Sequence, residues 1–225
     1  MKRAYYSNNE PADCTYVDIS YHVPFRSIPN EPGYYSEAHI GISDPTDTTN
    51  FPFKPTQWSY YWSQYTHFEV LSSTIDLYFQ PLDPTTVGDV YVPPVPYVGA
   101  VRPCTYTGYS LLDASDFLES PYTKHVYVGT GYGATPQTLS NTMTVRDCLG
   151  NKPMDIASTS CQFSDTGPYD FPVSLPPLQF RFRWAIMIIY PYLDVEEPAP
   201  TVTVGARTTW RVKFFNRRNL PLVAP

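Results

Sequence analysis

The sequence has few charged residues and no long apolar run. Asp, Glu, Lys and Arg make up only 16% of its 225 residues. The apolar stretch Trp184–Ile189 is far too short to cross a membrane as a helix. The first residues lack the apolar segment of a signal peptide, so none is expected. These features predict a protein that does not insert into membranes.

Motifs for metal binding are also missing. There is no Cys-x-x-Cys pair, and no cysteine has a histidine at metal-binding spacing, so neither zinc nor any other cofactor is predicted. The Asp/Asn-rich segment 44–50 lacks the spacing of a calcium loop. Free thiols are therefore expected at all four cysteines: Cys14, Cys104, Cys148 and Cys161.

No catalytic motif stands out, and we predict that the protein is not an enzyme. A Gly-x-Ser-x-Gly turn is absent, and all four histidines are expected on strand faces. The segment Gly129–Gly133 lacks the Lys-Ser/Thr of a phosphate loop, which favours a simple turn. Asp113, Asp116 and Glu119 on one short helical segment could form a glycosidase pair, but a solvated helix face is the favoured interpretation.

Proline and tyrosine, by contrast, are abundant. The 25 prolines exclude a largely helical protein and favour many irregular connections. Aromatic residues make up 16% of the chain, which argues against disorder. Tyrosine is also common at subunit interfaces, so part of the aromatic surface is expected to contact other subunits.

The stretch 179–216 gives the clearest structural signal. Its first run alternates Phe182, Trp184 and Ile186 with Arg181 and Arg183, and a second run over 202–216 alternates in the same way. Period-two alternation predicts strands with one buried face and one solvated face. Similar segments elsewhere bring the total to about eight strands; the first is expected at 14–25, and a short one at 141–150. A bulge or break is expected at 71–74, where the parity changes.

We therefore predict an all-β fold: a single jelly-roll sandwich of two antiparallel sheets, joined by long proline-rich loops. A short helix is expected near 110–120. The expected organisation is a flexible N-terminus at 1–12, one domain at 13–218 and a tail at 219–225.

The order of features resembles the capsid proteins of circular single-stranded DNA viruses, the circovirus-like group. The resemblance rests on the aromatic run Gln64–Val70 leading into Ser73–Phe79, on the segment Thr142–Gly150, and on the basic-aromatic end Thr208–Arg218. It implies a single jelly roll that self-assembles into a small icosahedral shell around circular single-stranded DNA. It also implies a virion protein that assembles inside the host cell, and it leaves the receptor open. The family's arginine-rich N-terminal arm is missing, because only Lys2 and Arg3 occupy that region.

Candidate functional residues follow from charge and from this resemblance. The segment 181–218 has seven basic and three acidic residues in a chain of net charge −6. In the family's topology the last two strands lie in opposite sheets, so Arg181 and Arg183 would face away from the last strand's basic residues. Solvated strand faces would explain the charge equally well. Nucleic-acid contacts are predicted at five residues: Arg207, Arg211, Lys213, Arg217 and Arg218.

The loops 81–96 and 151–178 are predicted to contact neighbouring subunits. The candidate interface residues are Tyr91, Tyr97, Tyr169 and Phe171. An alternative function is a carbohydrate-binding jelly-roll module. Its sugar platforms would be Trp58, Tyr60, Tyr61 and Trp62.

Overall fold

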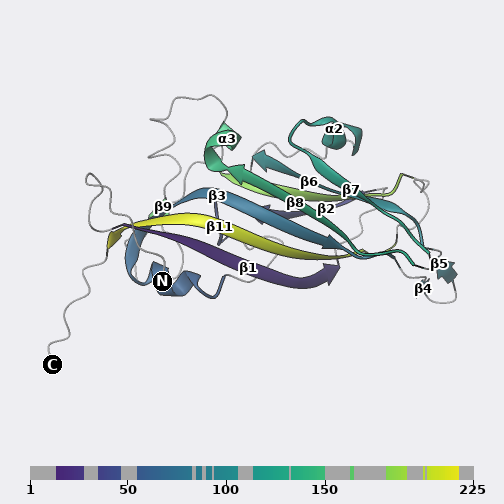
Figure 1. The fold of residues 1–225 in the computed structure, drawn as a ribbon, viewed down its shortest axis with the longest axis horizontal. Coiled ribbons are helices and arrows are strands. Elements are labelled where there is room, and N and C mark those ends of the chain that lie inside the picture. The colour runs from purple at the N-terminus through teal and green to yellow at the C-terminus, as the bar shows by residue number, and fades with distance from the viewer. Residues whose placement is uncertain are drawn as a thin grey trace.

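The protein folds as two antiparallel sheets packed face to face (Figure 1). The computed structural model describes residues 14–27, 35–46, 55–82, 85–87, 90–92, 94–105, 114–131, 133–149, 163–164, 181–191, 200 and 202–217. The predicted flexible N-terminus and C-terminal tail lie outside these ranges, so both stay predictions. None of the helices in the described ranges is long and apolar enough to cross a membrane.

Sheet A contains four long strands in the order β1, β11, β3, β8, and the short strand β9 also pairs with β3. Their bounds are β1 (Thr15–Ser27), β3 (Tyr65–Phe79), β8 (Gln137–Thr144), β9 (Phe163–Ser164) and β11 (Thr203–Arg217). Sheet B has the order β2, β10, β6, β7. Its bounds are β2 (Tyr35–Gly41), β6 (Tyr97–Thr105), β7 (Lys124–Val128) and β10 (Phe182–Ile189).

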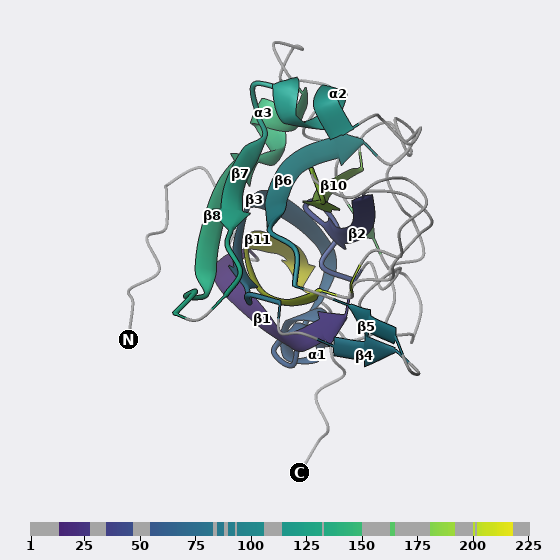
Figure 2. The same ribbon diagram turned by 90° about the vertical axis from the view of Figure 1, so that its right-hand side faces the viewer.

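This strand order defines a jelly roll. Among the eight long strands, every consecutive pair except β6 and β7 lies in opposite sheets. The chain therefore passes repeatedly from one sheet to the other (Figure 2). The predicted fold class is confirmed, and the last two long strands do belong to opposite sheets. A separate hairpin of β4 (Thr85–Val87) and β5 (Val90–Val92) lies within the predicted loop 81–96.

The central strand β11 follows the predicted alternation. Trp210, Val212 and Phe214 are buried, while Arg207 and Arg211 are exposed. Its neighbour β3 changes parity within the strand, as predicted. The register passes from Arg211 opposite Ser72 to Val212 opposite Val70, so Leu71 is the extra residue of a bulge.

Two tryptophans tie the sheets together across the core. Trp184 of β10 donates its indole N–H to Ser73 Oγ of β3 at 3.0 Å. Trp210 of β11 donates to the backbone oxygen of Gly41 at the end of β2, at 2.9 Å. Ser73 and Trp210 are opposite each other in the β3–β11 register. Both indoles are buried, so each finds its partner on the facing sheet, as a buried polar group requires.

The core is tight at Gly99 of β6. A Cβ atom built there would lie 2.6 Å from the ring of Phe79, which reaches across from β3. No real Cβ approaches a ring carbon so closely. Glycine therefore lets the aromatic ring pack against the strand backbone.

The outer face of β10 differs from the prediction. Ala185, Met187 and Ile189 share the parity of Arg181 and Arg183, so one-sided alternation predicts that they are solvated. They are buried instead, in a second apolar cluster that includes Phe117. Phe117 belongs to α2 (Ala114–Glu119), which confirms the predicted short helix and lies over this face of sheet B (Figure 2). A strand buried on both faces reads as a continuous apolar run, and Trp184–Ile189 is one.

Two further helices are short. The segment 145–149 was predicted as part of a strand, but it forms α3 (Val145–Leu149) instead. The cause is a reciprocal cap: the Asp147 N–H donates to Thr144 Oγ1 at 3.0 Å, and the Thr144 N–H donates to Asp147 Oδ2 at 3.4 Å. The aromatic helix α1 (Trp58–Trp62) precedes β3.

Candidate nucleic-acid interface

The predicted basic residues of β11 do share one face. Arg207 and Arg211 are exposed and Lys213 is half-buried, all at outward positions of sheet A. At about 3.3 Å per residue, they span roughly 20 Å along the strand. Arg217 is exposed at the end of β11. Arg218 lies outside the described residues.

Each of the three central cations has an acid directly across from it in the sheet. Arg211 is opposite Asp18 of β1. Arg207 is opposite Asp76, and Lys213 is opposite Glu69, both on β3. Side chains in such positions have Cβ atoms about 5 Å apart, close enough for opposite charges to attract. The three acids were not predicted as site residues, although Asp18 stands at an outward position of the first predicted strand.

Lys213 has the most structured surroundings of the three cations. Its ammonium group lies 5.6 Å from the ring centroid of Tyr16, which is opposite it on β1. Burial raises the pKa of the Glu69 carboxyl above its ordinary value, and the charge of Lys213 offsets part of that rise. Glu69 is therefore easier to protonate than a solvated glutamate.

A row of hydroxyl side chains crosses all four strands of the same face. Ser20, Thr209, Thr74 and Thr142 are successive partners in the register of β1, β11, β3 and β8. Ser20 and Thr209 share a hydrogen bond of 2.9 Å, and so do Thr74 and Thr142. The described outward residues of β8 are all uncharged. They are Thr138, Ser140, Thr142 and Thr144.

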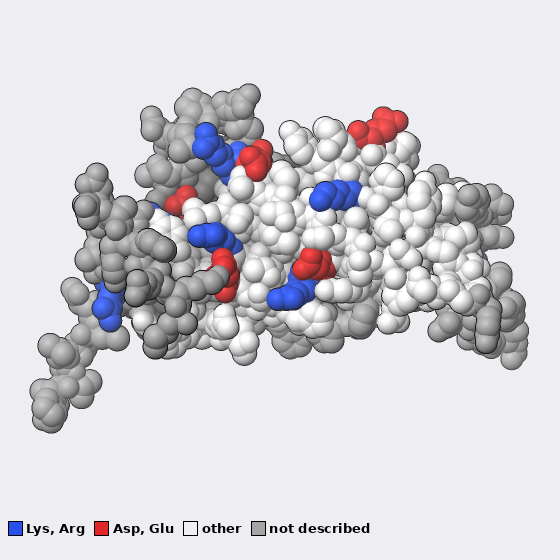
Figure 3. Space-filling model, viewed as in Figure 1, with Lys and Arg blue, Asp and Glu red and all other residues white. Residues whose placement is uncertain are grey.

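The result is a polar face with little net charge at its centre. Three cations and three anions alternate between neighbouring strands. In Figure 3, several Lys or Arg side chains lie next to Asp or Glu side chains and others stand apart, without a continuous basic band. Counterion release by unopposed cations dominates non-specific affinity for nucleic acids, and this face has few such cations.

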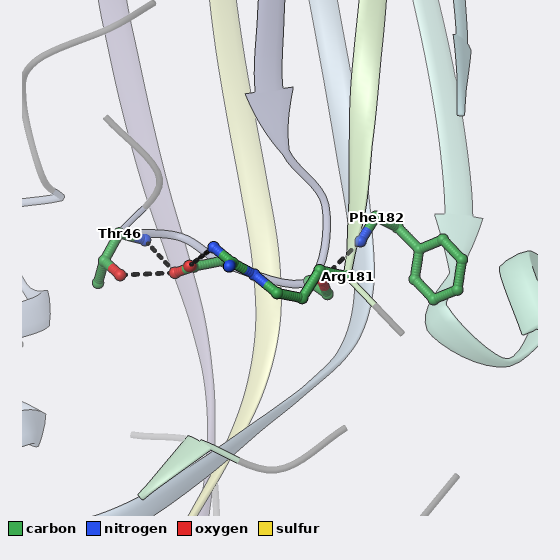
Figure 4. A network of polar contacts seen from close by, with 5 residues as sticks. Thr46, Arg181 and Phe182 are labelled. Carbon is green, nitrogen blue, oxygen red and sulfur yellow. Dashed lines mark hydrogen bonds and ion pairs between the residues drawn. The ribbon is translucent and has the colours of Figure 1, made fainter. Parts of the chain in front are cut away.

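Arg181, one of the two basic residues predicted to face away from those of the last strand, has a structural role. Arg181 Nη2 lies 3.4 Å from Asp44 Oδ2, and both side chains are largely buried (Figure 4). Asp44 Oδ1 also accepts hydrogen bonds from the backbone N–H and the hydroxyl of Thr46. The adjacent Phe182 N–H donates to Ser43 Oγ. Arg181 therefore fixes the segment after β2 to the start of β10.

The four residues predicted to contact neighbouring subunits lie in different parts of the chain. Tyr97 is buried in the core, and its hydroxyl donates to the backbone oxygen of Gln80 at 2.6 Å. That position leaves Tyr97 no surface for a neighbouring subunit, so its selection was wrong. Tyr91 is on β5, opposite Thr86. Tyr169 and Phe171 lie outside the described residues, as does most of 151–178.

The aromatic platform of the alternative function does not form. Trp58 and Trp62 are buried, with 0% and 2% exposure, and both pack against Phe68. Tyr61 is half-buried and stacks on Phe214. Within this group only Tyr60 is well exposed, so the four residues do not form a flat surface for a sugar.

Chemistry based on metals or thiols has little basis in the described part of the chain. No group of three or more His, Cys, Asp or Glu side chains there is placed to hold a metal ion. Cys104 has a free thiol. Burial, and to a lesser extent the nearby charge of Glu37, raises its pKa to about 12, so the thiol stays protonated and unreactive. Cys161 lies outside the described residues.

Comparisons with known proteins find similar folds only. The chain matches no protein-family model and no curated protein. One similar solved structure is a virus-like particle of the Macrobrachium rosenbergii nodavirus, with 10% identity, 98% of this chain and 94% of that chain covered, and a TM-score of 0.48. A second is mud crab tombus-like virus, with 12% identity, 98% and 89% covered, and a TM-score of 0.47.

A third is turnip yellow mosaic virus, with 11% identity, 99% of this chain and 92% of that chain covered, and a TM-score of 0.45. With identities this low and TM-scores below 0.5, these likenesses carry no functional argument. The jelly-roll assignment rests on the strand order and the register of the chain itself.

Proposed function

We propose that the chain is a viral coat subunit that assembles with copies of itself into a small icosahedral shell around a circular single-stranded DNA genome. It would then be a virion protein, with assembly inside the host cell. The observation that carries the proposal is the order of the eight long strands in two four-stranded sheets. This is the architecture that the resemblance to circovirus-like capsid proteins implies.

Jelly rolls serve both as coat subunits and as lectins, so the fold alone does not decide between them. The burial of Trp58 and Trp62 disfavours the lectin, because the residues expected to bind sugar are part of the core. The loops 81–96 and 151–178 remain our candidates for contacts between subunits. In a shell, such loops would be buried against neighbouring copies.

Negative-stain electron microscopy of the purified full-length chain tests the proposal. Closed particles of uniform diameter are expected, with a megadalton peak in size-exclusion chromatography. A well-folded chain that stays monomeric over a range of salt and pH values would refute it.

The contacts between subunits can be tested with Tyr91→Ser, Tyr169→Ser and Phe171→Ser. Loss of particles is expected, with unchanged circular dichroism and unchanged thermal stability. Tyr127→Ser is a matched control, since it removes an exposed tyrosine from β7, outside both candidate loops. Particle formation by all three loop variants would exclude these residues as interface residues.

The genome type is tested on particles treated with nuclease from outside and then extracted. Nucleic acid that resists RNase, is degraded by DNase and by a single-strand-specific nuclease, and resists exonucleases would be circular single-stranded DNA. Protected RNA would contradict this part of the proposal and leave shell assembly standing.

A further inference from the structure

The two sheets end in four outer strands, and a strand from another molecule could add to any of them. Among the described strands, β1 and β8 end sheet A, and β2 and β7 end sheet B. The backbone N–H and C=O groups on the open side of an outer strand can pair with a further chain. Proteins commonly prevent this with charges, prolines, bulges or very short outer strands.

Three of the four outer strands have such protection. β1 contains Pro24, and its register with β11 shifts between Val23 and Arg26. β2 carries the carboxylate of Glu37. β7 has only five residues and begins with Lys124. Strand addition to these three edges is therefore disfavoured.

β8 lacks these features. Its eight residues, Gln137–Thr144, include no charged residue and no proline, and they pair with β3 in an unbroken register. Thr138, Ser140 and Thr142 are exposed. A regular, uncharged edge of this length is suited to pairing with an extended strand from another molecule.

Part of the backbone of β8 points away from β3. In an antiparallel pair, alternate residues direct both of their backbone groups to the partner strand, and the residues between them direct both groups away. Ser140, Thr142 and Thr144 belong to the second set, because a backbone group of each bonds to a side chain outside β3. An added strand would have to pair with the backbone groups of these residues.

Three side chains, the closing side chains, already bond to this open side. Lys124 of β7 donates from Nζ to the backbone oxygen of Ser140 at 2.9 Å. Asn141 accepts the Thr142 N–H on Oδ1 at 3.0 Å. Asp147 of α3 accepts the N–H of the last residue of β8 on Oδ2 at 3.4 Å. Each of these contacts occupies a group that an incoming strand would need.

The start of β7 supports two of the closing side chains. β7 runs beside β8 along one side of the sandwich (Figure 1, Figure 2). Lys124 is the first residue of β7. Asn141 is 4% exposed, and its Nδ2 lies 3.4 Å from the backbone oxygen of Tyr122, two residues before that strand begins. The contacts therefore link the edge of sheet A to the edge strand of sheet B.

We propose that Lys124, Asn141 and Asp147 close the β8 edge against strand addition by a second copy of the chain. The second copy is the relevant partner because its own β8 is equally uncharged, so two such strands could pair without opposed like charges. The closed edge does not depend on the coat function. In a coat subunit it would keep sheet A from continuing into the next copy and leave the contacts to other surfaces.

The test opens the edge in the full-length chain by combining Lys124→Thr with Asn141→Ala. Threonine favours strands and is too short to reach the Ser140 oxygen. Asp147 is kept, because it also caps α3. Association is measured by sedimentation velocity at concentrations below the onset of particle formation. The fraction of chain in dimers and larger species should be at least about fivefold higher for K124T/N141A than for the natural sequence.

Hydrogen exchange followed by mass spectrometry locates the new contact. In the associated variant, the fragment covering 137–144 should exchange more slowly than in the monomer, because pairing protects the amides on the open side. Unchanged exchange in this fragment would place the contact elsewhere and refute the proposal. A K124T/N141A variant that remains as monomeric as the natural sequence would refute it as well.

Three controls separate an opened edge from other causes of association. Lys124→Arg keeps a long cationic donor and should remain monomeric. Arg146→Gln removes the same charge from an exposed position on α3. Ser73→Ala weakens the core, where Ser73 has 0% exposure. If Arg146→Gln or Ser73→Ala associates as much as K124T/N141A, lost charge or lost stability is the cause and the proposal is wrong.

Assembly is scored separately by negative-stain microscopy at higher concentration. A natural chain that forms no particles, together with an associating K124T/N141A variant, would refute the coat function and leave the closed edge standing. A natural chain that forms particles, together with a variant that does not associate below the onset of particle formation, would refute the closed edge alone.

Discussion

The hydrogen bond between Trp184 and Ser73 should contribute measurably to stability. It joins the two sheets at 3.0 Å, and both residues have 0% exposure. Ser73→Ala removes the acceptor and leaves the indole N–H buried without it. The cost of such an unsatisfied group is about 1–3 kcal/mol, a large part of the roughly 5–15 kcal/mol that stabilises a typical domain.

The assay is urea unfolding of the unassembled subunit, followed by far-UV circular dichroism so that loss of a tryptophan does not affect the signal. The midpoint should fall while the slope with urea stays constant, which identifies a change in stability alone. Thr74→Ala is the matched control. Thr74 is the next residue on β3 and bonds to Thr142, but on the outer face, so its loss should cost less than about 0.5 kcal/mol.

A double-mutant cycle with Trp184→Phe isolates the pair. Trp184→Phe alone should cost more than Ser73→Ala, because it also leaves a cavity in the core. The double variant should be less destabilised than the sum of the two, by at least about 0.5 kcal/mol. Additive losses, or a loss from Ser73→Ala as small as that from Thr74→Ala, would show that the contact does not hold the sheets together.

Three further predictions use the same unfolding assay. Gly99→Ala forces a methyl group against the Phe79 ring and should cost about 1–3 kcal/mol, while Gly129→Ala, with no atom within 4 Å, should be near neutral; equal effects would contradict the close packing. Phe117→Ala uncovers the outer face of sheet B and should cost about 3–5 kcal/mol; a loss below about 1 kcal/mol would mean that α2 is not part of the folded core. Because burial raises the pKa of Cys104 from 9.0 to about 12, the unfolded chain loses this proton first, and the free energy of unfolding should fall as pH rises between these values; Cys104→Ser should remove that part of the slope, and an unchanged slope would refute the burial.

The strands themselves could be predicted from the sequence because their signal is local. Alternation along β11 predicted which residues point inward, and the change of parity in β3 placed a bulge within 71–74, where the structure has it at Leu71. The jelly roll was predicted from the long connections, and the placement of the last two strands in opposite sheets came from the resemblance, since alternation does not say which strands pair. The error at 145–149 had a local signal too, because Thr144 and Asp147 have the spacing of a helix cap.

The features that sequence reasoning missed depend on contacts between distant segments. Ala185 and Met187 are small or flexible apolar residues that suit either a solvated face or one covered by a helix, and the covering residue Phe117 is far away in the chain. The acid partners were missed for the same reason. Asp18 and Asp76 become neighbours of the last strand only once the sheet order places β1 and β3 on either side of it.

The row of hydroxyls and matched charges lies entirely outside the core, so the charge of this face can be changed independently of the packing of the interior. Substitutions at Asp18, Glu69 and Asp76 could be made one at a time to give a graded series of surface charge, without repacking the interior. If the chain does form a container, its cargo could then be retuned from neutral molecules to polyanions while the subunit kept its shape.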